Sequence, residues 1–256
     1  MSSLLLGACA GTPGRQRAEA YRFDSVSNAC RQSPAHCAAL AGKETAGLPL
    51  AAAATTGSVV VRALEVLDRE LIEAALIECA DLARSDVLLR HRRDFAGPSP
   101  SREECHQQVK DAAGRRVSRA MQLGTEMHQV ALQCAKERLG QLRPGGFSLE
   151  PTYRYDSRSG QTKYLPEEDV AALRESGNGG ELLGTIAPDV VIHTGNPLHV
   201  QAVYDFKFPC FHLDDMPHWN TYPPGHPHHR IAQGHLYEAA LSAPAARVAP
   251  RIGVQR

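Results

Sequence analysis

The spacing of apolar positions predicts helices in the first part of the chain. Between residues 59 and 89, apolar side chains recur every three or four positions, which is typical of an amphipathic helix. The members of this stripe, which we expect to face the core, are Val60, Leu64, Leu67, Leu71 and Ala75. The prolines within residues 95–101 end the helix. Ser101 and Glu104 then have capping-box spacing, so a second, long helix is predicted to run to about residue 139.

From residue 147 onward the pattern changes to short apolar runs bounded by glycine and proline, which is typical of strands. The predicted strands cover residues 147–155, 182–193, 199–208 and 248–254. Two shorter helices are predicted over residues 166–176 and 230–241. A loop rich in proline and histidine, residues 209–229, precedes the second of these helices. The principal elements follow the order helix, strand, strand, strand, helix, strand. This order predicts an α/β fold, a small mixed sheet flanked by helices, with an added helical N-terminal region.

Composition divides the chain into four parts. Residues 10–57 are rich in Gly, Pro, Ala, Ser and Thr, which is typical of a tether. We therefore expect a signal remnant and tether, a linker that contains Cys30 and Cys37, a helical part, and a main domain; their ranges are 1–20, 21–57, 58–100 and 101–256. No run is apolar and long enough for a convincing membrane span.

The charge balance excludes a protein that binds nucleic acid by net charge alone. The chain has 28 Lys and Arg against 28 Asp and Glu, and its sequence pI is about 7.2. Basic residues nevertheless gather before and within the second predicted helix: Arg84, Arg90, Arg92, Arg93, Arg115, Arg116 and Arg119. Interspersed acidic residues favour a solvated helix surface, and a groove that follows phosphates is the alternative.

The N-terminus resembles the end of a bacterial lipoprotein signal. Leu6-Gly7-Ala8-Cys9 matches a lipobox, in which Cys9 receives the lipid. The basic and apolar regions of a signal peptide are incomplete before it, so either the true start lies upstream of Met1 or the match is accidental. The interpretation predicts an exported lipoprotein of the bacterial cell envelope, attached to the membrane through its N-terminal lipid.

Six cysteines remain when Cys9 is set aside, and an even number in an exported chain suits a disulfide framework whose pairing the sequence leaves open. Cys30 and Cys37 could close a small loop. Cys79 and Cys134 fall on apolar helix stripes, so buried free thiols are the alternative for them. No CxxC pair occurs, which makes a structural zinc site of the usual spacing unexpected.

Candidate chemistry lies on the two middle strands. Asp189 follows Pro188, and Asp205-Phe206-Lys207 follows on the next strand. Side chains alternate along a strand, so Asp205 and Lys207 share one face. Two carboxylates, with the Phe206 backbone carbonyl, form an oxygen-rich site that suits Mg²⁺ or Mn²⁺. Lys207 could orient the attacking water or stabilise charge on a phosphate. The alternative is an ordinary cross-strand ion pair.

Helical residues complete this candidate set. Gln233 and Tyr237 are four positions apart, on one face of the predicted helix after the strands. Glu126 flanks an apolar stripe of the long helix and could point to the same site, with Glu137 and Glu150 as competitors.

This ordered set resembles the PD-(D/E)XK nuclease superfamily, in the branch with a Q-x-x-x-Y motif after the catalytic lysine. The resemblance covers roughly residues 101–256 and implies a restriction-endonuclease-like core of order α-β-β-β-α-β. It implies that Asp189, Asp205 and the Phe206 carbonyl bind the metal, with Glu126 as a further ligand, and that Lys207 serves hydrolysis. Gln233 and Tyr237 would hold DNA or shape the site.

The lipobox and tether before such a domain resemble bacterial polymorphic toxins, specifically lipoprotein toxins with restriction-endonuclease-fold C-terminal domains. The resemblance implies a metal-dependent DNase that acts in the cytoplasm of competing cells, and a cognate immunity protein as partner. The alternatives are an RNase of the same fold, a catalytically inactive module that binds nucleic acid or a partner, and a structural envelope lipoprotein.

Two features of the 209–229 loop stay open. Its histidines could bind zinc or copper, or His228, His229 and Arg230 could contact phosphates at the start of the following helix. Trp219, the only tryptophan, could stack on a base or pack the loop onto the sheet.

Overall fold

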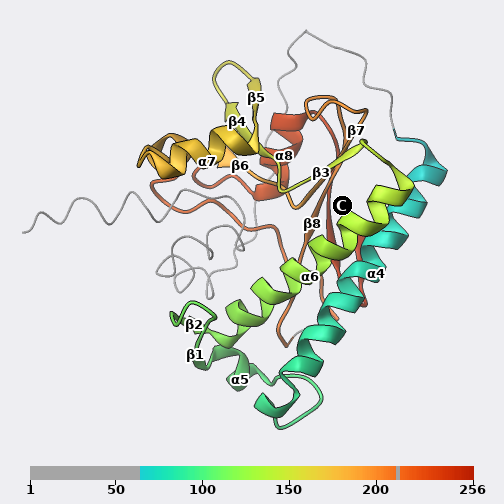
Figure 1. The fold of residues 1–256 in the computed structure, drawn as a ribbon, viewed down its shortest axis with the longest axis vertical. Coiled ribbons are helices and arrows are strands. Elements are labelled where there is room, and N and C mark those ends of the chain that lie inside the picture. The colour runs from blue at the N-terminus through green and yellow to red at the C-terminus, as the bar shows by residue number, and fades with distance from the viewer. Residues whose placement is uncertain (1–63, 212–213) are drawn as a thin grey trace, which may run out of the picture.

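The computed structural model describes residues 64–211 and 214–256 and shows a mixed α/β fold (Figure 1). A central sheet of five strands has the order β10-β9-β8-β7-β3. Only β8 and β9 are parallel, and the other pairs are antiparallel. The strands are β3 (Phe147–Leu149), β7 (Val190–His193), β8 (Val200–Phe206), β9 (Ala245–Ala249) and β10 (Gly253–Gln255).

Smaller strand units and the helices surround this sheet. A three-stranded sheet has the order β5-β4-β6, and β1 pairs with β2 in a hairpin. These strands are β1 (Gln108–Lys110), β2 (Arg116–Ser118), β4 (Thr152–Asp156), β5 (Gln161–Leu165) and β6 (Thr185–Ile186). The helices are α4 (Val66–Arg90), α5 (Arg102–His106), α6 (Arg119–Leu142), α7 (Glu167–Glu175) and α8 (Gln233–Leu241), with 3₁₀ turns at η1 (Arg92–Asp94) and η2 (Gly179–Leu182).

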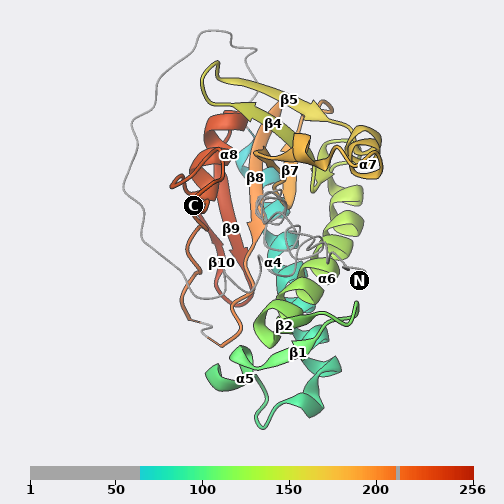
Figure 2. The same ribbon diagram turned by 90° about the vertical axis from the view of Figure 1, so that its left-hand side faces the viewer.

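The two faces of the central sheet are covered by different elements. Helices α4 and α6 lie side by side against one face, where they share a core with alternate residues of β7, β8 and β9. The opposite face packs against α8 and the three-stranded sheet, as the turned view in Figure 2 shows. The strands are therefore buried on both sides, and the end of β8 lies between α6 and α8.

The expected core-facing stripe of the first helix is confirmed at Leu64 and Ala75 and is wrong at Leu67 and Leu71. The last two are 73% and 57% exposed. The buried face of α4 carries Ile72, Ala75, Leu76, Cys79, Ala80, Ala83 and Val87. Both phases satisfy the helical period, but the buried one is rich in small side chains, which allow close packing against α6. Val60 lies outside the described residues.

The second predicted helix, over residues 101–139, is divided. Its capping box is confirmed, because the Ser101 hydroxyl accepts from the Glu104 amide at 3.2 Å and the Glu104 carboxylate accepts from the Ser101 amide at 2.7 Å. Helix α5 then ends at once, and the β1–β2 hairpin separates it from α6. The cause is a turn in which the Asp111 carboxylate accepts from the Ala113 and Arg115 amides, with Gly114 at φ 75°.

Three of the predicted strands are also split. Glu150, at φ 45°, and Pro151 separate β3 from β4, so residues 147–155 serve two sheets. Residues 182–193 divide into β6 and β7 around Ala187-Pro188. The last segment forms the β9–β10 hairpin, in which Arg251 has φ 66°. The helix at 166–176 and the strand at 199–208 are confirmed as α7 and β8, and the helix expected from 230 begins at Gln233.

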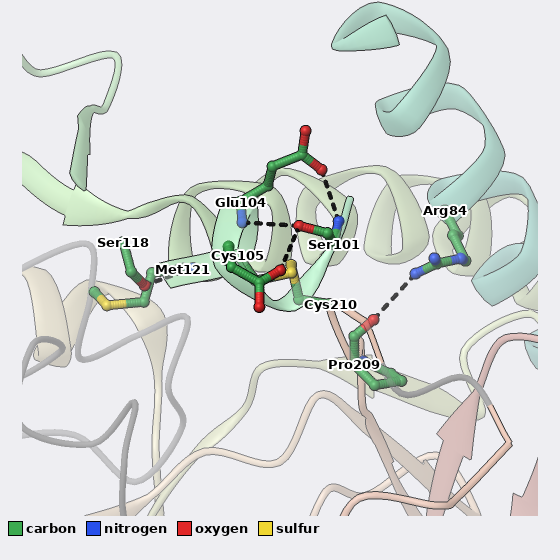
Figure 3. The surroundings of a disulfide bond; sticks show 9 residues. Arg84, Ser101, Glu104, Cys105, Ser118, Met121, Pro209 and Cys210 are labelled. Carbon is green, nitrogen blue, oxygen red and sulfur yellow. Dashed lines mark hydrogen bonds between the residues drawn. A yellow bond between two sulfur atoms is a disulfide. The ribbon is translucent and has the colours of Figure 1, made fainter. Parts of the chain in front are cut away.

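Two disulfides join parts of the fold that are distant in sequence. Cys79–Cys134 connects α4 to α6, and Cys105–Cys210 connects α5 to the segment after β8 (Figure 3). The expected disulfide framework is confirmed for these four cysteines, and the free-thiol interpretation of Cys79 and Cys134 is wrong. The other three cysteines lie outside the described residues. No helix in the described ranges is long and apolar enough to cross a membrane.

We expect loss of the Cys79–Cys134 bond to lower the free energy of unfolding by about 2–5 kcal/mol, because the bond constrains the unfolded chain across 55 residues. The comparison is Cys79→Ala/Cys134→Ala against the wild type in urea unfolding without reductant. A reductant should remove the advantage of the wild type. Equal stabilities under oxidising conditions would contradict the prediction.

Candidate active site

Two aspartates lie opposite each other where β7 begins and β8 ends. The antiparallel register pairs Val190 with Tyr204, and its continuation places Asp189 opposite Asp205. Both side chains are buried, at 0% and 2% residue exposure. Like charges directly opposite on one sheet face repel, so this pair needs positive charge nearby.

Lys207 supplies one compensating charge. Its Nζ lies 2.6 Å from Asp205 Oδ2, as expected for two residues on one face of a strand. Burial raises the pKa of Asp205, the Lys207 ammonium lowers it and the Asp189 carboxylate raises it again, with a net upward shift. The two carboxylates and the lysine are thus electrostatically coupled.

Helix α8 closes a ring of hydrogen bonds around this ion pair. Lys207 Nζ donates to Gln233 Oε1 at 2.9 Å, and Gln233 Nε2 donates to the Tyr237 hydroxyl at 2.7 Å. The Tyr237 hydroxyl donates in turn to Asp205 Oδ1 at 3.3 Å. The helical i, i+4 spacing of Gln233 and Tyr237 makes this ring possible, since it stacks both side chains on the face toward β8.

Trp219 packs the 209–229 loop against Lys207 and helix α8. The Lys207 ammonium lies 5.2 Å from the Trp219 ring centroid, and the indole meets the Tyr237 ring edge to face. A Cβ atom at Gly234 would come within 2.4 Å of the indole, so the first turn of α8 must present glycine there. Of the two roles considered for Trp219, the structure shows the packing role.

His128 on α6 is the residue that sequence reasoning missed. Its Nε2 lies 3.0 Å from the Phe206 carbonyl oxygen and 3.3 Å from Asp189 Oδ2, and its Nδ1 lies 2.9 Å from the Gly124 carbonyl oxygen. Because both ring nitrogens face oxygen acceptors, the imidazolium form fits this position. Its position directly after the core-facing Met127 is the signal that could have identified it.

The neighbouring carboxylates raise the pKa of His128. Burial lowers the pKa, but the charge of Asp189, the hydrogen bonds to Asp189 and Gly124 and the charge of Asp205 outweigh burial. Positive charge on His128 therefore offsets the charge of the two aspartates from the side opposite Lys207.

The structure does not bring Glu126 to this cluster. Its carboxylate lies 3.3 Å from Arg90 Nη1 and 3.0 Å from His91 Nε2. Glu126 precedes His128 by two residues, which places the two side chains on nearly opposite sides of α6. The helical phase thus selects His128 and excludes Glu126.

The two competing glutamates differ in position. Glu137 accepts from Gln133 on the exposed side of α6. Glu150 is adjacent to the cluster, because its amide donates to the Asp189 carbonyl oxygen at 3.0 Å. Its left-handed backbone ends β3 beside the start of β7.

The candidate phosphate contacts His228, His229 and Arg230 differ in exposure, because His228 is buried and the other two are exposed. His228 is buried, and its Nε2 donates to the Gly184 carbonyl oxygen at 3.2 Å. Its amide donates to His226 Nδ1, and His226 stacks on Tyr222. These contacts assign His228 to the packing of the loop, while His229 is exposed.

The carboxylate and carbonyl oxygens at this site are ligand types that a hard cation prefers. Asp189 Oδ1 is buried with no hydrogen-bond partner, and Asp189 Oδ2 accepts from the Phe206 amide at 2.7 Å. An unpaired buried carboxylate oxygen costs free energy unless a cation or donor meets it. As the side chains stand, no group of three or more His, Cys, Asp or Glu among residues 64–211 and 214–256 is arranged to hold a metal ion. Lys207 and His128 occupy the carboxylate oxygens that a cation would share.

No protein-family model matches this chain, and comparisons with curated proteins and with solved structures give no match.

Gly234→Ala should displace Trp219, because the added methyl group overlaps the indole. We expect about 1–3 kcal/mol lower unfolding free energy and a red-shifted emission from the single tryptophan. Gly140→Ala on α6 is the matched control, since a Cβ there meets no atom within 4 Å. An unchanged emission spectrum in Gly234→Ala would disprove the packing role.

Asp189→Asn should lower the pKa of His128 in the metal-free protein, measured by NMR titration in EDTA. With the folded-state pKa above the unfolded value of about 6.5, charged His128 stabilises the fold below that pH, and this contribution disappears as pH rises through the folded pKa. Asp156→Asn on the exposed β4–β5 hairpin is the control substitution. A His128 pKa unchanged by Asp189→Asn would contradict the ion pair.

Proposed function

We propose that this protein is a metal-dependent nuclease that hydrolyses phosphodiester bonds of DNA. The observation that carries the proposal is the buried ring that joins Asp205, Lys207, Gln233 and Tyr237, with the open oxygen of Asp189 opposite. Buried ion pairs often contribute no more stability than well-packed apolar side chains of similar volume, so stability alone does not explain this cluster. A strongly coupled, buried group of titratable side chains is a feature of active sites.

Asp189, Asp205 and the Phe206 carbonyl are the groups that would hold Mg²⁺ or Mn²⁺. His128 replaces Glu126 as the proposed fourth group, because its Nε2 already lies between the Phe206 carbonyl and Asp189. The bound cation would polarise the phosphate and lower the pKa of a water molecule. A neutral His128 is required for this role, so metal binding would release its proton.

Lys207 is the proposed catalytic residue of the chain. Its ammonium is held from three sides, by Asp205, Gln233 and the Trp219 ring. Release of Asp205 to a cation would leave Nζ fixed by Gln233 and available to an attacking water or a phosphate oxygen. Gln233 and Tyr237 would position the lysine and the carboxylate.

The proposal extends to an exported lipoprotein toxin that acts on neighbouring cells. The two disulfides support export, because such bonds persist in oxidising compartments and are rare in the cytoplasm. The lipobox at Cys9 lies outside the described residues and stays a prediction, as do the membrane anchor and the immunity protein.

The test is incubation of the purified chain with supercoiled plasmid, with Mg²⁺ or with EDTA. We expect Mg²⁺-dependent nicking, and a loss of about 100-fold or more in Lys207→Ala, because the substitution removes the charge-stabilising group. Lys163→Ala, on an exposed position of β5, is the matched control and should retain activity.

Failure of folded wild-type protein to cleave DNA would contradict the proposal. Cleavage of RNA in a parallel reaction would identify the substrate as RNA. Metal binding without cleavage of either would identify a binding module. Thermal unfolding of each variant distinguishes lost chemistry from lost structure.

A further inference from the structure

Five exposed basic side chains gather at the end of the molecule formed by η1, α5 and the β1–β2 hairpin. They form no ion pair with any residue in the described ranges, and they are Arg92, Arg93, Arg102, Lys110 and Arg116. We call residues 92–118 the basic arm. The arm lies at one end of α6, away from the three-stranded sheet (Figure 1).

The acidic residues of the arm are largely engaged already. Asp94 pairs with His91 and Arg119, and Asp111 pairs with Arg115. Glu104 is held in the capping box. Interspersed acids pair with three members of the basic run, Arg90, Arg115 and Arg119. Glu103 adds a negative charge beside Arg102. No acid in the described ranges forms an ion pair with the five exposed cations.

The arm is fixed to the chain segment that leaves the active site. Cys105 is bonded to Cys210, three residues after Lys207. Arg84 is buried and donates to the Pro209 carbonyl oxygen at 3.0 Å, as Figure 3 shows. The Arg102 guanidinium lies 5.1 Å from the Phe211 ring centroid. Segment 209–211 is thus held at three successive residues by α4 and the arm.

The arm also continues directly into the helix that carries His128. Strand β2 ends at Ser118, which caps α6. At about 1.5 Å per residue, Ser118 lies about 15 Å along the helix from His128. B-DNA rises about 3.4 Å per base pair, so this distance corresponds to about four base pairs from the cluster.

We propose that the basic arm binds the sugar–phosphate backbone of duplex DNA about four base pairs from the bond to be cleaved. The inference rests on the proposed nuclease function and names the surface that supplies DNA affinity to a chain of zero net charge. Arg102, Lys110 and Arg116 contact phosphates, and the Cys105–Cys210 bond sets the register between those contacts and Lys207. Phosphate contacts of this kind are independent of sequence and depend on salt.

The test measures binding of the full chain, with its disulfides intact, to a short fluorescein-labelled DNA duplex in EDTA, where cleavage is suppressed. The variant Arg102→Gln/Lys110→Gln/Arg116→Gln removes three arm charges. We expect its dissociation constant to rise by about 10-fold to 100-fold, and the slope of log affinity against log salt to fall by about 2–3.

The matched control removes three charges elsewhere, in Lys136→Gln/Arg158→Gln/Lys163→Gln, all exposed on α6 or the β4–β5 hairpin. Loss of these three charges weakens the overall attraction of the protein to DNA only slightly, so we expect the dissociation constant to change by less than about 2-fold. Equal affinity and salt slope for the two triple variants would overturn the proposal. A preference for an RNA duplex over DNA in the wild type would overturn the choice of DNA.

The outcomes separate this proposal from the nuclease proposal. Salt-dependent binding through the arm, without Mg²⁺-dependent nicking, supports the arm and refutes the enzyme. If the arm variant nicks plasmid and binds the DNA duplex with the wild-type dissociation constant, the nuclease proposal is supported and the role of the basic arm is refuted. Wild-type protein that does not bind duplex DNA refutes the arm.

Discussion

Two negative charges buried opposite each other constrain the rest of the structure. Asp189 and Asp205 are almost fully removed from solvent at adjoining strand ends, and burial and the Asp189 charge both raise the pKa of Asp205. Lys207 and His128 approach the pair from two elements and offset its charge. These two contacts require β8 to end between α6 and α8. Asp189 Oδ1 is buried without a hydrogen-bond partner, which lowers the stability of the fold and also makes this oxygen available to a cation.

The packing around this cluster follows from that requirement. Helix α6 must hold His128 in place, and its contacts with α4 are reinforced by small side chains and by the Cys79–Cys134 bond. On the other side, Gly234 allows Trp219 to lie on α8 beside Lys207. Arg247, the β9 neighbour of Asp205, donates to the Pro217 carbonyl oxygen and secures the loop that carries Trp219. Disulfides and loop contacts therefore support a polar centre that would be costly in isolation.

The sequence predicted the chemistry of the strands better than that of the helices. Side chains two residues apart on a strand always share a face, so the proximity of Asp205 and Lys207 was predictable from their spacing alone. The shared face of Gln233 and Tyr237 followed from i, i+4 spacing, but their hydrogen bonds to Lys207 and Asp205 were not predicted. Glu126 was chosen and His128 was overlooked, because an apolar stripe alone does not say which flanking polar residue of a helix faces the sheet. On α4 the helical phase was ambiguous by about one residue, so Leu67 and Leu71 were expected on the buried face that carries Ile72 and Cys79.

Long-range and turn-controlled features were less predictable. The β1–β2 hairpin depends on hydrogen bonds of Asp111 and the backbone of Gly114, which interrupt a helical pattern without changing its apolar period. The split of residues 147–155 between two sheets depends on the backbone of Glu150. The disulfide pairing joins residues 55 and 105 positions apart, and such separations carry no local signal.

Diffraction from crystals soaked in Mn²⁺, recorded at a wavelength where manganese scatters anomalously, shows whether the aspartate pair binds a cation. We expect an anomalous peak bound by Asp189, Asp205 and the Phe206 carbonyl oxygen, with Lys207 displaced from Asp205 Oδ2 and still held by Gln233. Crystals that show no peak there, with the Lys207–Asp205 and His128–Asp189 contacts intact, would contradict metal binding at this site. The cluster would then be a structural charge network.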